Sequence, residues 1–354
     1  MHLELSDEFR SFTDSVSRYL SDHTDRSIAS LLPGLANLGI FQLAVPESVG
    51  GIGAGGSEIM TIMRVLGRSV AAEPIINHVF LPAWLLCQSQ SQRARGLLAE
   101  IAQGQIPLAL AHDEPNGRHP IRKIATTAVP DATGYRLCGS KCCVIGGDIA
   151  QLLLVSATLE NGDIGIFLVD GGIPGLVVIP LRPHGHSAMA HVRLDSVAVP
   201  PDSLLLRAAP STGFFLRFDD HARFLLAAEA IGIMDKLIDS TIEHLQTRVQ
   251  FGRPLSQFQA LQHRIVDMVV QRSRAEALAI QAALCASEET FSRASLYAKY
   301  YANEAGKFIG RQAIQLHGGM GLTKELEVGR LYKRLLAISC LYGDSDYILD
   351  VLVS

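Results

Sequence analysis

The chain has 354 residues, of which 48% are hydrophobic and 19% are charged, a composition typical of a packed globular protein and unlike that of a disordered one. Its 31 Lys and Arg residues against 35 Asp and Glu residues give a net charge of −4, which argues against nucleic-acid binding because such proteins carry a basic excess. The length allows two or three domains.

Residues 1–104 are predicted to form a helical N-terminal domain. Its first residues, MHLELSDEFRSF, carry acids early and lack the basic-then-apolar layout of a secretion signal. No uninterrupted apolar run in the chain approaches the roughly 20 residues that span a membrane. A helical period of three and four residues is set by Phe9, Phe12, Val16 and Tyr19.

A glycine-rich segment interrupts this helical pattern. Gly51, Gly53 and Gly56 match the G-x-G-x-x-G fingerprint of dinucleotide-binding proteins, with Ser57 as the expected N-cap of a following helix. The fingerprint binds pyrophosphate only when a strand precedes it, and here the preceding segment has a helical pattern. We therefore favour a turn between helices over a nicotinamide site.

Residues 105–207 are predicted to form an antiparallel β-barrel or sandwich. Short β-rich runs recur about every ten residues and are separated by turn dipeptides such as Asn161-Gly162. His184 and His186 lack a third metal ligand at a readable spacing, so no metal site is expected. The six cysteines lack C-x-x-C spacing and predict reduced core thiols of a cytoplasmic protein.

Residues 208–354 are predicted to form a C-terminal four-helix bundle. One helix is expected to end near Phe251, a second to run over about 261–286 and a third over about 294–316. The expected fold class is therefore α+β, with a helical domain, a β domain and a helical bundle in chain order.

Two stretches of the bundle carry residues suited to a ligand. Arg248, Phe251 and Gln259 surround a helix–helix corner, where a guanidinium, an aromatic ring and an amide can bind a phosphorylated aromatic molecule. A helix hairpin with a capping arginine explains the same residues. Gly318 and Gly319 likewise either admit the backbone of a ligand or merely end a helix.

Together these stretches resemble the acyl-CoA dehydrogenase family, and the likeness covers nearly the whole chain. The segments RVQFGRPLSQFQALQHRIVDM and QLHGGMGLTKELEVGR carry it most specifically. Within the family the chain is most similar to the small subunits of heteromeric members such as pimeloyl-CoA dehydrogenase. The resemblance implies FAD at a subunit interface and oxidation of the Cα–Cβ bond of an acyl-CoA thioester, with an electron-transfer flavoprotein as acceptor.

The catalytic glutamate of the family is missing at both of its usual places. Gly343 occupies the C-terminal one, and Ala222 occupies the alternative one, on the first bundle helix. Two acids lie nearby: Glu229, two helical turns from Ala222, and Asp344, whose side chain is expected to point elsewhere. Glu229 is a weak candidate, since a single acid in such a helix usually packs or pairs.

The cofactor contacts implied by the resemblance divide into two groups. Positions where the β domain of the family contacts the flavin ring with hydroxyl groups are Asp113, His119 and Ile145 here. Positions that reach the ADP part of a neighbour's FAD match the family; they are Arg248, Phe251, Gln259, Gln315, Gly318 and Gly319.

We therefore expect a subunit without a catalytic base in a dimeric or tetrameric assembly, whose sister chain supplies the glutamate and the flavin pocket. Asp220 and Arg223 match positions near the thioester channel, although an exposed ion pair at a helix start explains them equally well. Two alternatives stay open. One is a homo-oligomeric flavoenzyme with Glu229 or Asp344 as its base, and the other is a catalytically silent scaffold. The acyl chain cannot be read from the sequence.

Overall fold

The computed structural model describes residues 3–23, 28–105, 108–115, 124–181, 189–323 and 326–353. Contacts divide the chain into two compact units. Unit 1 combines residues 1–22, 55–72 and 220–354, and unit 2 combines residues 23–54 and 73–219. The predicted N-terminal helical region therefore contributes segments to both units, and the three-domain division remains a prediction.

The N-terminal helices begin where local capping and amphipathic patterns allow. In α1 (Asp7–Asp22), the Ser6 Oγ accepts the Phe9 N–H at 3.1 Å, and Val16 and Leu20 are buried. The remaining helices of this region are α2 (Ile28–Asn37), η1 (Phe41–Ala44), η2 (Glu47–Val49), α3 (Gly56–Arg68), α4 (Ala72–Ile75), η3 (Ile76–Phe80), α5 (Leu81–Cys87) and α6 (Gln92–Ala102).

The glycine-rich segment is a turn between helices, as predicted. The short helices η1 and η2 precede it, rather than a strand, and Gly53 has a φ of +61°. A Cβ atom on Gly56 would lie 2.3 Å from the Ala283 carbonyl oxygen, so this glycine lets α3 approach α8 closely. Ser57 is not the N-cap, because α3 already begins at Gly56 with Gly55 as its cap.

Eight strands form one sheet in the order β6-β7-β3-β2-β4-β5-β8, with β1 beside β4. Most neighbours are antiparallel, but β1 and β2 both run parallel to β4, so the sheet is mixed rather than purely antiparallel. The strands are β1 (Leu108–Ala111), β2 (Thr127–Asp131), β3 (Gly134–Ile145), β4 (Leu152–Leu159), β5 (Ile164–Asp170), β6 (Leu176–Leu181), β7 (Met189–Val199) and β8 (Leu204–Ala208).

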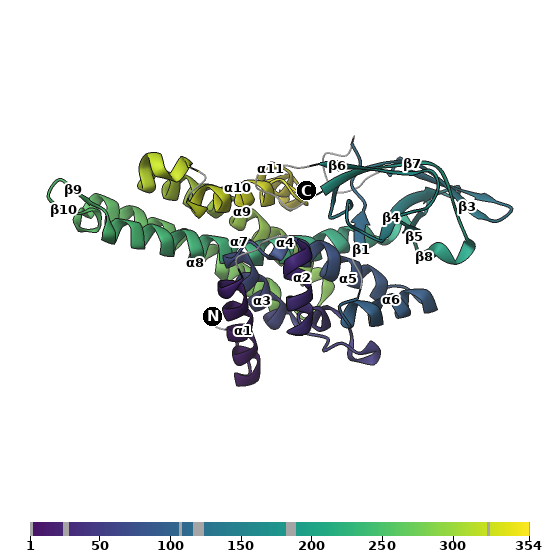
Figure 1. The fold of residues 1–354 in the computed structure, drawn as a ribbon, viewed down its shortest axis with the longest axis horizontal. Helices are drawn as coiled ribbons and strands as arrows, with labels where there is room; N and C mark the ends of the chain where they lie inside the picture. The colour runs from purple at the N-terminus through teal and green to yellow at the C-terminus, as the bar shows by residue number, and fades with distance from the viewer. Residues whose placement is uncertain are drawn as a thin grey trace. The chain divides into compact units, whose positions relative to one another are not determined.

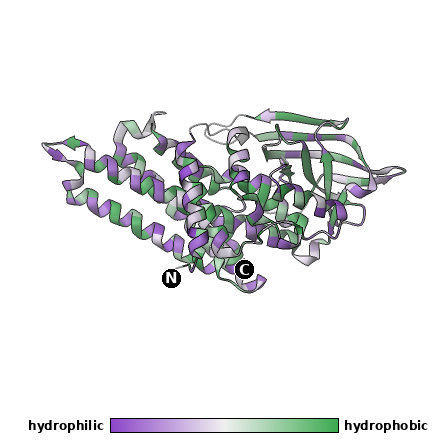
Figure 2. Cartoon of the chain, turned by 60° about the horizontal axis from the view of Figure 1, so that its bottom comes forward, coloured by the Kyte–Doolittle hydropathy of each residue, from purple (hydrophilic) through white to green (hydrophobic). Residues whose placement is uncertain are grey.

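The sheet packs an apolar core that includes Leu137, Phe167 and Val192, and Figure 2 shows the hydrophobic residues along its strands. A bulge in the β3–β7 pairing gives Cys143 a φ of +53° and leaves it exposed. All six cysteines are free, but four are exposed and two half-buried. The prediction that they are core residues is therefore wrong, because they lie at positions such as the end of α5 and an outward position of β3.

The C-terminal helices belong to unit 1 from residue 220 onward. They are α7 (Phe214–Thr247), α8 (Gln259–Ala283), α9 (Glu288–His317), α10 (Glu327–Ile338) and α11 (Ser345–Val353). Apolar residues at helical spacing form the inner face of α7, where Ile242 is half-buried and the others are buried: Phe224, Ala228, Ile231, Ile238 and Leu245. The two-residue strands β9 (Val249–Gln250) and β10 (Arg253–Pro254) link α7 to α8 (Figure 1).

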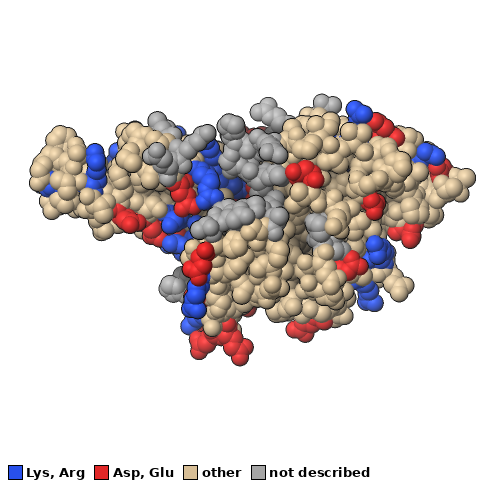
Figure 3. All heavy atoms as spheres, in the orientation of Figure 1, with Lys and Arg blue, Asp and Glu red and all other residues tan. Residues whose placement is uncertain are grey.

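Within the described residues, no helix combines the length and the hydropathy that a membrane crossing requires. On the face drawn in Figure 3, acidic and basic side chains lie in small mixed groups separated by uncharged surface.

Candidate functional site

The corner between α7 and α8 is a tight β-hairpin. Phe251 and Gly252 form its tip with φ angles of +53° and +78°, as a type I′ turn requires at both central positions. Phe251 is 89% exposed. A left-handed backbone costs a residue other than glycine roughly 1–2 kcal/mol, and an aromatic ring gains nothing from water. The exposed ring and the unfavourable backbone therefore suggest that the tip contacts a ligand or another chain, because a turn alone would favour glycine at both positions.

The hairpin is braced against the start of α8. The Leu255 N–H donates to the Arg248 carbonyl at 2.9 Å. The Arg253 guanidinium lies 4.1 Å from the centre of the Phe258 ring, and Phe251 meets the same ring edge-on at 6.1 Å. Because α8 begins at Gln259, the hairpin presents the N-terminal end of a 25-residue helix beside Phe251.

The end of α9 supplies the second group of predicted residues. Gln315, Gly318 and Gly319 are all exposed. Gly318 has a φ of +64°, and a Cβ atom added at either glycine would have no neighbour within 4 Å among the described residues. The two glycines thus border open space, which a backbone-contacting ligand can fill.

Packing brings these helix ends together. The rings of His244 on α7 and His317 on α9 stack with centroids 4.5 Å apart. The Arg264 Nε donates to the Gln312 Oε1 at 2.6 Å between α8 and α9. Arg248 follows His244 by one helical turn, with its N–H donating to the His244 carbonyl at 2.9 Å. One end of the helical bundle therefore gathers the ends of three helices that carry predicted cofactor-binding residues.

Arg248 places a positive charge near His244 at this bundle end. Burial lowers the pKa of His244, and the nearby His317 and Arg248 lower it further. The exposed Arg248 guanidinium forms no ion pair with any described residue, and neither Gln259 nor Gln315 uses its amide in a described hydrogen bond. Arginine and amide donors beside a helix N-terminus suit a phosphate-bearing molecule.

The two positions of the missing base are both buried. Ala222 is fully buried on α7. Gly343 is buried with a φ of +114°, and a Cβ atom there would lie 2.9 Å from the Tyr347 ring. The backbone itself is adapted to the absence of a side chain at Gly343.

Buried cations hold the segment that contains Gly343. The Lys299 Nζ donates to the carbonyl oxygens of Ile338 and Gly343 at 2.8 and 3.3 Å and to the Asn303 Oδ1 at 2.7 Å. The Arg223 Nε donates to the Tyr342 carbonyl at 2.9 Å. Burial lowers the pKa of Lys299 to about 7, with the Arg223 charge adding to the effect.

Asp220 and Arg223 belong to this buried arrangement. The Arg223 Nη1 donates to the Asp220 Oδ1 at 2.7 Å, and the Ser295 Oγ donates to the same oxygen at 3.1 Å. Burial raises the pKa of Asp220, although these partners act in the opposite direction. Their alternative interpretation as an exposed pair is wrong, because both side chains are at most 4% exposed.

The two acids near the missing base are both engaged elsewhere. Glu229 is fully buried, and its carboxylate accepts from the Arg334 Nε and Nη2 at 2.7 Å each. The Asp344 Oδ1 accepts the Tyr347 N–H at 2.9 Å and so caps α11, which agrees with the expectation that it points away. These bonds favour structural roles for both carboxylates.

The β-domain loop forms a buried polar network in which the His112 Nε2 has no partner among the described residues. The buried Lys141 Nζ donates to the Glu114 Oε1 at 2.7 Å, to the Ser156 Oγ at 3.0 Å and to the His112 carbonyl at 3.1 Å. Burial and the Lys141 charge lower the pKa of His112 to about 3. Ile145 is only 8% exposed. Asp113 is exposed, whereas His119, His184 and His186 lie outside the described residues.

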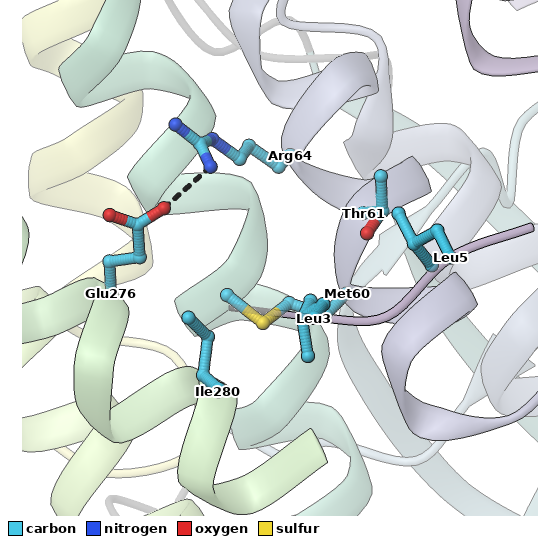
Figure 4. Close-up of a pocket in the computed structure, with 7 residues that line it drawn as sticks. All are labelled: Leu3, Leu5, Met60, Thr61, Arg64, Glu276 and Ile280. Carbon is cyan, nitrogen blue, oxygen red and sulfur yellow. Dashed lines mark hydrogen bonds and ion pairs between the residues drawn. The ribbon is translucent and has the colours of Figure 1, made fainter. Parts of the chain in front are cut away.

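A separate pocket of about 240 Å³ lies between the N-terminal segment, α3 and α8 (Figure 4). Leu3 and Met60 line its apolar side, and the Arg64–Glu276 ion pair of 2.6 Å lies at its edge. None of the residues predicted to bind cofactor or substrate is among the seven that line it.

The sequence analysis did not predict the stack of His244 and His317 or the buried pair of Lys299 and Asn303. His244 precedes Arg248 by four residues and His317 lies inside the QLHGG segment, so their positions beside predicted site residues could have indicated the histidine pair. Lys299 and Asn303 lie four residues apart in a stretch of small and aromatic residues, which could have indicated a buried amine. Their partners are distant in sequence and only the fold identifies them.

Residues 215–353 match the family model described as "Acyl-CoA dehydrogenase, C-terminal domain". An acryloyl-CoA reductase (NADH) of Anaerotignum propionicum is 28% identical over 324 residues, which cover 88% of this chain and 82% of that protein. A chain of the ChsE4–ChsE5 complex from Mycobacterium tuberculosis superposes with a TM-score of 0.86 at 25% identity, covering 100% of this chain and 98% of its own length. A Tcur3481–Tcur3483 steroid ACAD variant superposes with a TM-score of 0.86 at 29% identity, and the match covers 98% of this chain and 97% of that one. The similarity thus extends over both units.

Proposed function

Because this chain belongs to the acyl-CoA dehydrogenase family, we propose that it takes part in the α,β-dehydrogenation of an acyl-CoA thioester as the subunit that lacks the catalytic base. A sister subunit of the same family supplies the carboxylate and the flavin pocket. This chain supplies the bundle end that carries Arg248, Gln259 and Gln315. The assembly is a heteromeric dimer or tetramer in the cytoplasm, with an electron-transfer flavoprotein as its acceptor.

The observation that carries this proposal is the backbone at Gly343. A residue with a φ of +114°, packed against the Tyr347 ring, cannot present a glutamate without rearrangement. The adjoining carbonyl oxygens are held by Lys299 and Arg223, which are buried cations. Proton abstraction from a substrate needs a carboxylate in reach, and Gly343 offers none.

FAD is the cofactor of the family, and when bound it accepts the hydride that leaves the acyl chain. The bundle end fits the ADP part of this molecule, because the Arg248 guanidinium and the Gln259 and Gln315 amides are exposed donors. The exposed Phe251 ring offers an apolar face for a purine, and Gly318 and Gly319 leave room for a close backbone approach. In the proposed complex these residues bind the cofactor of the sister subunit.

The described part of the β domain fits the flavin ring poorly. Lys141, Glu114 and Ser156 satisfy one another, and Ile145 offers no hydrogen bond where the family has a hydroxyl. This contrast supports a cofactor shared with a sister chain over one held by this chain alone. Asp220 and Arg223 act here as positioning residues for the 338–343 segment.

The relatives named as pairs are compatible with a two-chain enzyme. The ChsE4–ChsE5 structure is described as a complex, and the Tcur3481–Tcur3483 protein carries two names. A specific relation to pimeloyl-CoA dehydrogenase remains a prediction, as does the identity of the acyl chain.

Co-expression tests the proposal directly. The chain is purified alone and together with the acyl-CoA dehydrogenase-like chain encoded beside it, and flavin absorbance and acyl-CoA-dependent acceptor reduction are recorded. Flavin and activity should appear only in the complex. Activity of this chain alone would instead establish the self-sufficient enzyme, and a colourless protein that never joins the sister chain would establish the scaffold alternative.

A further inference from the structure

Strand β3 carries two consecutive cysteines at its bulge. The pairing of β3 with β7 shifts register between Lys141 and Val144. Two residues, Cys142 and Cys143, therefore stand opposite the single residue His191. Because consecutive Cα atoms lie only about 3.8 Å apart, the bulge sets two thiols side by side on one strand.

Neither cysteine is enclosed by the core of the sheet. Strand residues normally alternate between the two faces of a sheet. Lys141 and Val144 are both buried although they are three residues apart, so the bulge interrupts the alternation and the two residues between them stay out of the core. Cys142 is half-buried and Cys143 is exposed. A small molecule in solution can therefore reach this pair of thiols.

Backbone and side-chain contacts hold the pair together. The Cys142 N–H donates to the Asp113 carbonyl at 2.9 Å, and Cys143 has a φ of +53°, which is unfavourable for a residue other than glycine. Burial raises the pKa of Cys142 to about 12, and the neighbouring Cys143 adds to the shift through its charge and through a hydrogen bond between the two side chains. The two sulfur atoms are therefore within hydrogen-bonding reach of each other.

Two adjacent thiols suit a thiophilic atom that takes two bonds. A zinc ion needs more ligands, and among the residues that the structure describes no three histidine, cysteine or carboxylate side chains are placed to hold a metal ion. A monovalent copper ion between two thiolates would carry a net negative charge, which the high pKa of Cys142 disfavours. A trivalent arsenic atom bonds covalently to two sulfur atoms and leaves the pair neutral.

We propose that Cys142 and Cys143 form a chelating site for trivalent arsenicals. In the reaction with phenylarsine oxide, both S–H bonds break and two S–As bonds form on one arsenic atom. The oxygen of the arsenical leaves with the two protons as water. Arsenic stays trivalent, so the reaction requires neither an oxidant nor a reductant. The site lies on β3 and does not depend on the proposed dehydrogenation.

Chelation distinguishes this pair from the other cysteines, none of which has a cysteine as its neighbour in the sequence: Cys87, Cys138, Cys285 and Cys340. Once the first S–As bond has formed, the second thiol reacts within the same molecule. Such an intramolecular second contact strengthens binding by about 10²–10⁴-fold over a single one. One arsenical per chain should therefore bind at Cys142 and Cys143 before any single thiol is modified.

Titration of the purified, reduced chain with phenylarsine oxide tests the site. Intact mass spectrometry should show the addition of one arsenical with the loss of one water, and a count of reactive thiols should fall by two. The adduct should survive an excess of the monothiol mercaptoethanol. Ethanedithiol should remove it, because a small dithiol offers arsenic a competing pair of sulfur atoms.

Substitutions locate the adduct. Cys142→Ser and Cys143→Ser should each raise the dissociation constant for phenylarsine oxide at least about a hundredfold, because each variant keeps only one thiol of the pair. The matched control is Cys138→Ser, which removes an exposed thiol from the same strand and should bind like the unmodified chain. Thermal melting should be unaltered in all three variants, and the exposed Cys143 is the position least able to disturb the fold.

Three results would overturn the proposal. The first is unchanged binding in both Cys142→Ser and Cys143→Ser. The second is an adduct that consumes one thiol and is removed by mercaptoethanol. The third is a loss of binding in Cys138→Ser equal to that in Cys143→Ser.

Discussion

The bundle end and the Gly343 segment are both rich in polar donors, yet they use them in opposite ways. At the bundle end, Arg248, Gln259 and Gln315 are exposed, and their side chains form no hydrogen bond or ion pair with the described residues. Around Gly343, Lys299 and Arg223 are buried and bonded to backbone carbonyls. Because a buried donor without a partner is costly whereas an exposed one is merely hydrated, the first region can meet a ligand and the second provides rigidity.

The largest expected change in stability concerns the buried ion pair between Arg334 and Glu229. Arg334→Met leaves the Glu229 carboxylate buried without its bidentate partner, so the free energy of unfolding should fall by about 3–5 kcal/mol. Urea denaturation measures the change. Arg330→Met is the control, because Arg330 and Glu327 form a half-exposed pair on the same helix and should contribute less than about 1 kcal/mol. Equal losses would contradict the structural role of Glu229.

Restoring the family carboxylate should not restore the site. Gly343→Glu forces a side chain onto a φ of +114° and against the Tyr347 ring, which should lower the free energy of unfolding by about 1–3 kcal/mol. The chain alone should still show no acyl-CoA-dependent acceptor reduction. The control is Gly96→Glu, where the added Cβ meets nothing within 4 Å among the described residues. A stable and active Gly343→Glu chain would refute the assignment of this segment as non-catalytic.

The lowered pKa of Lys299 predicts how the stability of the buried region changes with pH. Its pKa is lowered from 10.5 to about 7 in the folded chain, so between about pH 7 and 10.5 the unfolded chain binds more protons. The contribution of Lys299 to the free energy of unfolding therefore increases as pH rises from about 7 to 10.5, and it decreases as pH falls back towards 7. Denaturation at several pH values should show a flatter dependence for Lys299→Met than for the unmodified chain. The exposed Lys333→Met should retain the original slope.

Substitution of Arg248 at the bundle end should have the smallest effect on stability and the largest effect on flavin content. Arg248→Ala removes an exposed side chain without a described partner, so the free energy of unfolding should change by less than about 0.5 kcal/mol. Flavin content of the co-purified complex should fall at least tenfold, because a charge-assisted contact to a phosphate is lost. Arg193→Ala, an exposed arginine on β7, should keep its flavin. Unchanged flavin in Arg248→Ala would remove the bundle end from the cofactor site.

Local sequence patterns were sufficient to predict the helices and turns, but they did not predict the environment of individual side chains. The second bundle helix, predicted to begin at about residue 261 and found to begin at Gln259, and the turn at Gly51–Gly56 follow from neighbouring residues. Burial of Asp220 and Arg223 could not be predicted, because their environment is made by Ser295 and Tyr342, more than 70 residues away. The exposure of the cysteines was missed for the same reason, since composition does not say which face of a strand or helix is covered.

The sequence by itself determined the alternation of helical and β-rich segments, the absence of the family glutamate and the retention of the residues predicted to bind a neighbour's cofactor. Hydrophobic period, turn residues and residue identity are properties of nearby positions, so no folded structure is needed to read them. The tertiary structure alone decided that Glu229 belongs to Arg334, that Lys299 and Arg223 hold the Gly343 segment, and that His244 meets His317. Those pairings depend on desolvation and on contacts between distant helices, which exist only once the helices have packed.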